Sequence, residues 1–522
     1  MKSRQLCSRG VLRALAVFAV AWLVAGCGDD SKLNKVTHII ILMQENHSFD
    51  NYFGALAYAP GGPYHSPQSN NPAPGQKPGC AQGDHQCVDG LSCVANADGT
   101  LTCSNSNLDD DGSTAYAFHN PSRCVVPDLD HGWADTHKEI NFVNPSQTFL
   151  ESFNDGFVRI NDITEQPDGG VESPTDDPTM GFYTQDDLSS YYNMAENFAI
   201  DDRYFASVPG PTFPNRSYLM AATSFGHLTT AEFFPPPGNY KPQTGTIFDL
   251  LDQNGITWAD YFQDLPLSFI FRPVTDPHVL PQSMFFSQLA NAPETLPQVI
   301  FMDPSLGAAG VATENDEHPP TDIQRGQAYV SKTISAIRNS AIWSSTIVFI
   351  TYDEHGGFYD HVNPPIAMQG GIRTPDGVAP GQCADLSNLP ASLQPGGGAQ
   401  CSTNPSDNSL QDAEALCPAL TSNPTGPYPD ACASFDQLGL RVPLIAVSPF
   451  SKPHYVSHTI GDHASLLALI ERRFLTIDGS RLYLTQRDRY ANTLEDMFDF
   501  DASPSLNTPV VTAPPPAVDC TP

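Results

Sequence analysis

Two short apolar runs, far apart in the chain, both end in residues that carry side-chain oxygens. The run 38–43 is rich in isoleucine and is followed by Glu45 and Asn46. The run 346–350 is followed by an Asp-Glu pair at 353–354. Uninterrupted apolar runs of this length are typical of strands that are buried on both faces of a parallel sheet. The sequence therefore predicts an α/β fold in which both runs lie in one central sheet.

The polar ends of these two strands predict a ligand site. In open α/β sheets, ligands bind beyond the carboxyl ends of the strands, so Glu45, Asn46, Asp353 and Glu354 are expected at one rim. Such oxygens suit a hard divalent cation and a phosphate. Capping of a turn is the alternative explanation for Asn46 alone. Adjacent carboxylates from two strands, however, would repel one another in a half-buried crevice unless a cation lay between them.

The N-terminal segment has the pattern of an export signal. Basic residues precede a mostly apolar stretch, 11–25, and Cys27 follows. The pattern resembles bacterial lipoprotein signals, which implies a signal peptide over 1–26, lipidation of Cys27, a tether over 27–35 and an exported, membrane-anchored protein. One alternative is an ordinary cleaved signal with a coincidental cysteine. The other is a transmembrane helix, but the apolar stretch is shorter than the ~20 residues that a span needs.

The cysteine content agrees with export. Ten cysteines remain when Cys7 and Cys27 are set aside, an even number in a compartment that permits disulfides. They gather mainly in two clusters, which predicts disulfide-bonded loops rather than a cross-linked core. A four-cysteine zinc site is the alternative for each cluster, but the sequence has no tight CxxC pair. The ten are Cys80, Cys87, Cys93, Cys103, Cys124, Cys383, Cys401, Cys417, Cys432 and Cys520.

The overall charge is strongly negative. The chain has 58 acidic residues against 25 lysines and arginines, a formal net charge of −33. Nucleic-acid binding requires basic side chains that neutralise phosphates, so this composition argues against a nucleic-acid partner. A solvated acidic surface accounts for most of the excess, and part of it is available for metal ions.

The strand signals recur over most of the chain, and they predict one large domain over 36–500. Two loop-rich insertions with cysteines are expected, at about 60–125 and about 366–436. The proline-rich end, 501–522, is expected to be irregular. A chain of 522 residues could form two or three average domains, but the two acidic strand ends must lie together.

The spacing of apolar residues predicts the other main elements. The expected strands are roughly 36–44, 256–262, 298–302, 346–350 and 441–447. The expected helices are 186–200, 246–254, 321–339 with Thr321 as its N-cap, and 463–474.

The segment 208–216, Val-Pro-Gly-Pro-Thr-Phe-Pro-Asn-Arg, predicts a sharp turn into a helix. Pro214 suits the first helical turn, so Thr212 is expected at or just before a helix N-terminus. The helix dipole there favours an anion such as an alkoxide or a phosphate. From this segment alone, a simple N-cap explains Thr212 better than a nucleophile does.

Several histidines stand in polar, turn-rich segments rather than on apolar helix faces. They are His131, His318, His355 and His361. Any one of them is more often structural than catalytic. As a set beside carboxylates, they suit phosphate binding, metal ligation or protonation of a leaving alkoxide.

Together these motifs resemble the bacterial phosphoesterase family, which includes phosphatidylcholine-type phospholipases C and related acid phosphatases. The opening motif is Glu45 to Gly54, with His47 where the family usually has arginine. The other motifs follow in the family's order over about residues 36–475. They are Asp130 to Trp133, Gly210 to Arg216, Glu317 to Pro320, Thr351 to Gly357 with Asp360 and His361, and Arg441 to Pro443 with Ser448 and Pro449.

The resemblance implies an alkaline-phosphatase-like sandwich, in which helices flank a mostly parallel sheet and the Cys-rich loops are insertions. It implies a divalent metal ion whose ligands are Glu45, Asn46, Asp353, Glu354 and Thr212. Thr212 is also the implied nucleophile. The histidines that the resemblance places around the phosphate are His131, His318 and His355.

The expected function is metal-dependent hydrolysis of a phosphoester, with a phospholipase C-type phosphodiester reaction through a phosphothreonine on Thr212. The substrate would be a phosphoester such as a phospholipid. One alternative is an acid phosphatase that acts on phosphomonoesters, and another is a non-catalytic surface protein that binds through its insertions. A sulfatase is disfavoured because no Cys-x-Pro-x-Arg or Ser-x-Pro-x-Arg signature surrounds the candidate nucleophile.

Overall fold

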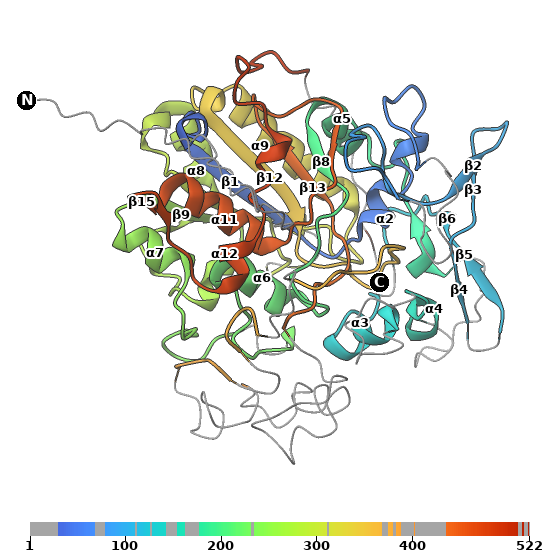
Figure 1. The fold of residues 1–522 in the computed structure, drawn as a ribbon, viewed down its shortest axis with the longest axis horizontal. Helices are drawn as coiled ribbons and strands as arrows, with labels where there is room; N and C mark the ends of the chain where they lie inside the picture. Colours follow the sequence, from blue (N-terminus) through green and yellow to red (C-terminus); the bar gives the residue numbers. More distant parts are fainter. Residues whose placement is uncertain are drawn as a thin grey trace, which may run out of the picture.

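An eight-stranded sheet forms the centre of the structure (Figure 1). The computed structural model describes residues 30–67, 79–109, 112–125, 128–141, 154–161, 177–230, 234–308, 310, 313–367, 374–378, 383–387, 401, 435–509, 514–515 and 520. The strands of the sheet, in spatial order, are β10 (Val279–Pro281), β9 (Trp258–Phe262), β11 (Val299–Asp303), β1 (His38–Gln44), β12 (Thr346–Tyr352), β13 (Leu444–Val447), β8 (Ala199–Asp201) and β14 (Tyr455–Ser457).

The sheet is mostly parallel. All pairs from β10 to β12 are parallel, as is the pair β8–β14, and only β13 runs antiparallel to both of its neighbours. Every residue of β12 and all but the first of β1 are buried. The predicted α/β fold with two doubly buried central strands is therefore confirmed.

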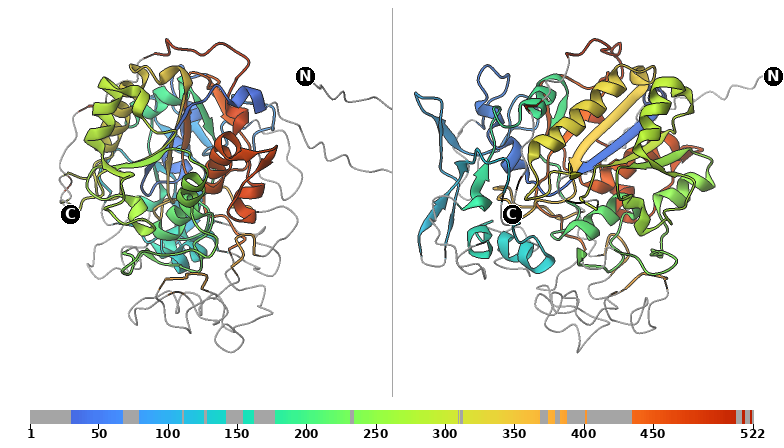
Figure 2. Two further views of the ribbon diagram at one scale, coloured as in Figure 1. Left: turned by 90° about the vertical axis from the view of Figure 1, so that its left-hand side faces the viewer. Right: turned by 180° about the vertical axis from the view of Figure 1, so that it is seen from behind.

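Helices cover both faces of this sheet (Figure 2). On one side α5 and α8 contact α9, and on the other α6 contacts both α7 and α11. The helices are α1 (Asp30–Leu33), α2 (Phe49–Phe53), α3 (Trp133–Ile140), α4 (Phe157–Ile160), α5 (Ser189–Asn197), α6 (Thr212–Ala221), α7 (Ile247–Gln253), α8 (Gln282–Asn291), α9 (Ile323–Arg338), α11 (His463–Phe474) and α12 (Gln486–Tyr490).

The first insertion forms a separate layer at one end of the sheet, together with α3 and α4 (Figure 1). It has its own small apolar core, which includes Leu91, Cys103, Ile140 and Phe157. The remaining short strands are β2 (Cys93–Ala95), β3 (Leu101–Cys103), β4 (Ser106–Leu108), β5 (Thr114–Tyr116), β6 (Phe118–His119), β7 (Gly181–Phe182), β15 (Thr476–Ile477) and β16 (Ser480–Arg481). None of the described residues after Asp501 lies in a helix or strand.

Two details of the predicted elements are wrong. The helix expected over 186–200 ends at Asn197, because the next residues form β8 and pair with β13 and β14. The N-cap of α9 is Asp322 rather than Thr321, and its carboxylate accepts a hydrogen bond from the Gln324 amide. A negative side chain at this position also interacts favourably with the helix dipole.

Eight of the ten cysteines form disulfides: Cys80–Cys87, Cys93–Cys103, Cys124–Cys520 and Cys383–Cys401. Three of the four close short loops, as predicted. The other, Cys124–Cys520, joins the first insertion to the C-terminal tail across 396 residues. The predicted signal peptide, Cys27, Cys417 and Cys432 lie outside the described residues. In the described part of the chain, no helix is long and apolar enough to cross a bilayer.

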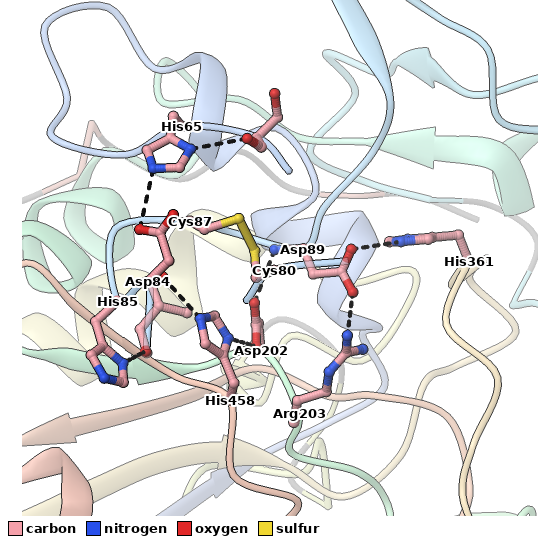
Figure 3. Close-up of a disulfide and its surroundings, with 12 residues drawn as sticks. His65, Cys80, Asp84, His85, Cys87, Asp89, Asp202, Arg203, His361 and His458 are labelled. Carbon is pink, nitrogen blue, oxygen red and sulfur yellow. Dashed lines mark hydrogen bonds and ion pairs between the residues drawn. A yellow bond between two sulfur atoms is a disulfide. The ribbon is translucent and has the colours of Figure 1, made fainter. Parts of the chain in front are cut away.

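A buried network of charges joins the insertion to the sheet. Arg441, which is fully buried, donates to both oxygens of Asp360 at 3.0 and 3.1 Å and to Asp50 at 3.0 Å. His361 Nδ1 lies 2.6 Å from Asp50. Asp89 lies between His361 and Arg203, next to the Cys80–Cys87 disulfide (Figure 3). The position of the insertion on the sheet thus depends on matched charges.

The protonation of His361 contributes to stability. Burial alone would lower its pKa, but Asp50 and Asp89 outweigh burial and raise the pKa from 6.5 to about 9. A group whose pKa is raised by folding stabilises the fold fully below its unfolded pKa and loses that contribution as the pH rises through its folded pKa. The contribution is on the order of 3 kcal/mol at low pH, and it is lost between about pH 6.5 and pH 9.

We therefore expect His361→Asn to destabilise the protein strongly at pH 6 and only slightly at pH 9.5. Urea unfolding at the two pH values measures the difference in free energy of unfolding between variant and wild type. His454→Asn, at an exposed histidine, is the control and should show a small difference at both values. An equal loss of stability at pH 6 and pH 9.5 would contradict the assignment of a charged His361.

Candidate active site

The ends of β1 and β12 lie side by side. In their parallel register Met43 is level with Thr351 and Gln44 with Tyr352, so the next residues of each strand leave the sheet together. The Asn46 amide donates to Asp353 Oδ1 at 3.3 Å. Asn46 has a positive φ of 65°, a conformation that asparagine tolerates better than most residues. The predicted meeting of the two polar strand ends is confirmed.

A glycine permits this close approach. A Cβ atom at Gly356 would lie 2.2 Å from the carbonyl oxygen of Asn46. Gly356 also has a positive φ of 64°, which a residue with a side chain rarely adopts. The glycine after His355 is therefore required by the contact between the two strand ends.

Arg216 connects helix α6 to both strand ends. Its guanidinium donates to Glu45 Oε1 at 2.9 Å and to Asp353 Oδ2 at 3.1 Å. Thr212 is the first residue of α6 and precedes Arg216 by four positions, which places both on the same face of the helix. Thr212 is 7% exposed, like Glu45. The structure thus positions the predicted nucleophile one helical turn from a side chain that contacts two predicted metal ligands.

The turn before Thr212 is fixed by hydrogen bonds from the side chain of Asn215, a residue of the same motif. The Asn215 side chain accepts from the Val208 amide at 3.0 Å and donates to the Gly210 carbonyl at 2.7 Å. A Cβ atom at Gly210 would lie 2.7 Å from the ring of Trp133. The Gly-Pro-Thr motif therefore packs directly on the helix that follows His131.

His131 completes the cluster from another segment. Its Nδ1 lies 2.6 Å from the Leu129 carbonyl, and its Nε2 lies 3.3 Å from Asn46 Nδ2 and 3.7 Å from Glu354 Oε1. Burial would lower the pKa of His131, but Glu354 and Asp128 outweigh burial and raise it to about 9. The two carboxylates therefore favour the protonated form of the imidazole.

His318 lies beside His131, with 6.1 Å between the ring centroids. Its Nδ1 faces the Pro319 carbonyl at 2.6 Å and its Nε2 lies 3.8 Å from Asp128 Oδ2. Burial would lower the pKa of His318, but Asp128 and Glu45 raise it above its ordinary value. The ligand atoms of Asp128, His131 and His318 lie within 4.8 Å of one another, close enough together that they could hold a metal ion.

His355 is placed differently from the other two histidines. Both of its ring nitrogens face carboxylates: Nε2 lies 2.8 Å from Glu139 Oε2 and Nδ1 lies 3.3 Å from Glu354 Oε2. Burial would lower its pKa, but Glu139 and Glu354 raise it to about 9. With the ring only 1% exposed, these contacts favour a role in orienting Glu354 over direct contact with a phosphate.

The residues present fit a divalent cation. Two buried oxygens in this cluster, Asn46 Oδ1 and Glu354 Oε1, have no hydrogen-bond partner within the described structure. Burial raises the pKa of Asp353 to about 7, and the negative charges of Glu45 and Glu354 add to this effect although Arg216 opposes it. A cation among these hard oxygen donors would satisfy both oxygens and remove the repulsion.

The His47 departure from the family pattern affects a different part of the structure. His47 stacks between the rings of Tyr52 and Phe358, at centroid distances of 4.4 and 4.9 Å, and its Nε2 lies 2.9 Å from the Glu317 carbonyl. Burial lowers its pKa to about 4, so the ring is neutral. The contacts of His47 are aromatic and uncharged, whereas an arginine would need a buried anion.

Glu317, which the motif Glu317 to Pro320 singled out, lies in the same aromatic cluster. Its carboxylate accepts hydrogen bonds from three tyrosine hydroxyls at 2.5 to 2.6 Å. Burial raises its pKa to about 7, although these hydrogen bonds oppose the increase. The hydroxyls belong to Tyr52, Tyr191 and Tyr352. Glu317 thus supports the loop that carries His318.

Sequence reasoning missed two residues of the cluster. Arg216 was part of a motif, but nothing in its local sequence indicated that it would bridge Glu45 and Asp353. Glu139 carried no signal at all, because its partner His355 is 216 residues away.

Several known proteins with similar sequences are named phospholipases C. The chain is 32% identical over 495 residues to non-specific phospholipase C6 of Arabidopsis thaliana, covering 92% of this chain and 76% of that protein. It is 27% identical over 511 residues to phospholipase C B of Mycobacterium tuberculosis, covering 91% of this chain and 80% of that protein.

A solved protein of the alkaline phosphatase superfamily from Vibrio parahaemolyticus is similar at a TM-score of 0.30 and 8% identity, over 59% of this chain and 64% of that chain. The model of the Phosphoesterase family matches residues 36–476, which include both strand ends, the Thr212 helix and the histidine segments. The chain belongs to the Phosphoesterase family.

Proposed function

We propose that this phosphoester hydrolase is a metal-dependent phospholipase C-type enzyme that uses Thr212 as its nucleophile. Membership of the Phosphoesterase family and the similarity to phospholipases C support hydrolysis of a phosphoric ester bond. The observation that carries the finer proposal is the convergence of Glu45, Asn46, Asp353 and Glu354 at one rim, next to the helix that begins at Thr212.

The proposed ligands of the divalent ion are Glu45, Asn46, Asp353 and Glu354, with the hydroxyl of Thr212. When bound, such an ion supplies Lewis-acid chemistry: it lowers the pKa of a nearby hydroxyl and offsets negative charge on a phosphoryl group. Arg216 keeps two of these carboxylates in place through its hydrogen bonds to Glu45 and Asp353.

The chemistry of the chain's own residues follows in two steps. Thr212 loses its hydroxyl proton to solvent, and its Oγ1 forms a bond to phosphorus as the bond to the leaving alcohol breaks. A protonated imidazole, His131 or His318, gives its proton to the leaving alkoxide. In the second step, water gives a proton to the now neutral imidazole and forms a bond to phosphorus. The bond between phosphorus and the Thr212 oxygen breaks, and this oxygen takes up a proton from solvent to restore the hydroxyl.

Phosphodiesters are the proposed substrate class, because the similar proteins are named phospholipases C. An acid phosphatase that acts on phosphomonoesters is the second candidate, since the same nucleophile and acid could serve both reactions. A non-catalytic binding protein is disfavoured by the presence of a competent side chain at every proposed ligand and nucleophile position.

We also propose that the enzyme is exported and held at a bacterial membrane or cell surface by a lipid on Cys27. The basic start, the apolar stretch and the position of this cysteine support the proposal, and the disulfides suit an oxidising compartment. Lipid labelling of the expressed wild type and of Cys27→Ser tests the anchor.

Thr212→Ala is expected to lower turnover of a choline phosphodiester by at least about 10³-fold, because the nucleophile is removed. Thr212→Ser keeps a hydroxyl and should retain measurable activity. Purified mature protein is assayed on the choline phosphodiester and on a simple phosphomonoester, and faster hydrolysis of the diester is expected. Near-wild-type turnover by Thr212→Ala would reject the nucleophile, and a clear preference for the monoester would favour the acid phosphatase.

Exhaustive chelation is expected to abolish activity, and addition of a divalent ion should restore it, because the proposed reaction needs the ion to lower the pKa of the Thr212 hydroxyl and to offset charge on the phosphoryl group. Asn46→Gly removes the unpartnered Oδ1 but tolerates the positive φ. This variant should require roughly tenfold or more metal for half-maximal recovery. Full activity in the chelated wild-type enzyme would show that no exchangeable metal takes part.

A further inference from the structure

Helix α3 carries a buried carboxylate that the mechanism above does not use. Glu139 is fully buried and stands near the C-terminal end of α3. Its Oε2 accepts from His355 Nε2 at 2.8 Å, and its Oε1 accepts from Asn161 Nδ2 at 2.9 Å. Each carboxylate oxygen of Glu139 thus accepts one hydrogen bond. Each donor, His355 or Asn161, also contacts a residue of the candidate active site or its loop.

The first partner leads to Glu354. His355 Nδ1 lies 3.3 Å from Glu354 Oε2, and the Gly356 amide donates to the same oxygen at 2.7 Å. These two contacts fix Oε2, and they leave Oε1 without a hydrogen-bond partner, 3.7 Å from His131 Nε2. The orientation of Glu354 therefore depends on a histidine whose other nitrogen is held by Glu139.

The second partner leads to His131. Asn161 Oδ1 accepts from the Asp130 amide at 2.7 Å, immediately before His131 in the chain. Its side-chain nitrogen also donates to the Phe157 carbonyl at 3.2 Å, which ties it to helix α4. The side chain of Asn161 is fully buried. The same asparagine thus joins Glu139 to the loop that presents His131.

These contacts close a ring. It runs from the His131 loop through Asn161, Glu139, His355 and Glu354, and returns to His131. Every side chain of the ring other than His131 is 1% exposed or less. A buried ring of this kind has few alternative arrangements, since rotation of any member would leave a polar atom unpaired in the interior.

We propose that Glu139 is a positioning residue, which acts with Asn161 to aim Glu354 at the cation and His131 at the leaving group. The proposal rests on the proposed metal-dependent function. Glu139 would hold His355 so that its Nδ1 engages Glu354 Oε2 and leaves Oε1 for the cation. Carboxylates that orient a metal-site side chain in this way commonly contribute 10- to 100-fold to metal affinity or activity.

The test is Glu139→Gln, which keeps the size of the side chain but removes its charge and one acceptor. The chelated variant and wild type are titrated separately with Mg²⁺, Ca²⁺, Mn²⁺ and Zn²⁺ by isothermal calorimetry. For the ion that wild type binds most tightly, the variant should bind about 10- to 100-fold more weakly. Its kcat on the choline phosphodiester should recover in part at saturating metal, because the ligands themselves remain.

Glu471→Gln is the matched control. Glu471 is also a fully buried glutamate on a helix, α11, and burial raises its pKa well above the ordinary value. This control measures the cost of a buried Glu-to-Gln change away from the site, and its metal affinity should equal that of wild type. The Tm of metal-free Glu139→Gln should fall further than the Tm of the control, because His355 loses a buried charged partner.

Asn161→Ala is the second variant, for use if Glu139→Gln does not fold, and a weaker loss of metal affinity is expected. Unchanged metal affinity in the folded variant would overturn the positioning role, and so would a large fall in Tm without a loss of affinity. A wild-type chain that binds none of the four ions would overturn the metal-dependent function itself, which distinguishes the two failures.

Discussion

The parallel pairing of β1 with β12 is the contact on which the site depends. Because side chains alternate across a strand, a slip of one residue would send every side chain to the opposite face and displace Glu45 and Asn46 from Asp353. Both strands are buried on both faces, so their apolar side chains enforce the register from two sides. The packing of the sheet thus determines where the site carboxylates lie. Arg216 then connects helix α6 to them through hydrogen bonds to Glu45 and Asp353.

Two buried clusters of charge in this protein look alike in composition and differ in how their polar atoms are paired. Around Arg441, the carboxylates of Asp50 and Asp360 are matched by the guanidinium and by a protonated His361. Asp50, Asp360 and His361 lie close enough together to hold a metal, but their atoms already have partners. Unpartnered oxygens distinguish the active-site cluster from this structural one, since a buried polar atom without a hydrogen bond is costly unless a ligand satisfies it.

The active-site cluster also remains short of positive charge. Arg216 is one cation for Glu45 and Asp353, and burial still raises the pKa of Asp353 to about 7. Glu354 depends on His131 and His355 instead, and these histidines lower its pKa despite its burial. A metal ion at the rim would therefore interact chiefly with Glu45, Asp353 and the two unpartnered oxygens, Asn46 Oδ1 and Glu354 Oε1, while His355 holds the other oxygen of Glu354.

Much of the site could be predicted because its residues follow strands that local sequence identifies well. Apolar runs revealed β1 and β12, and the rule for parallel sheets placed their ends together. Strand pairings and side-chain contacts between residues that are distant in sequence could not be predicted, because they depend on tertiary packing. The antiparallel direction of β13 depends on its neighbours in the sheet, and the helix expected through Ile200 ended early because β8 pairs on both edges. Glu139 lies on a helix of eight residues, in which periodicity carries little information.

The first insertion contacts the candidate active site through helix α3, which carries Glu139. Ile140, next to Glu139, and Phe157 lie in the apolar core of the insertion, and the Phe157 ring also packs edge-on against His355 at 6.0 Å. Leu91 and Cys103 belong to the same core. The disulfide at Cys93–Cys103 therefore stabilises a hydrophobic cluster that in turn supports the residues around Glu354. The first insertion is thus part of the framework around His355 and Glu354.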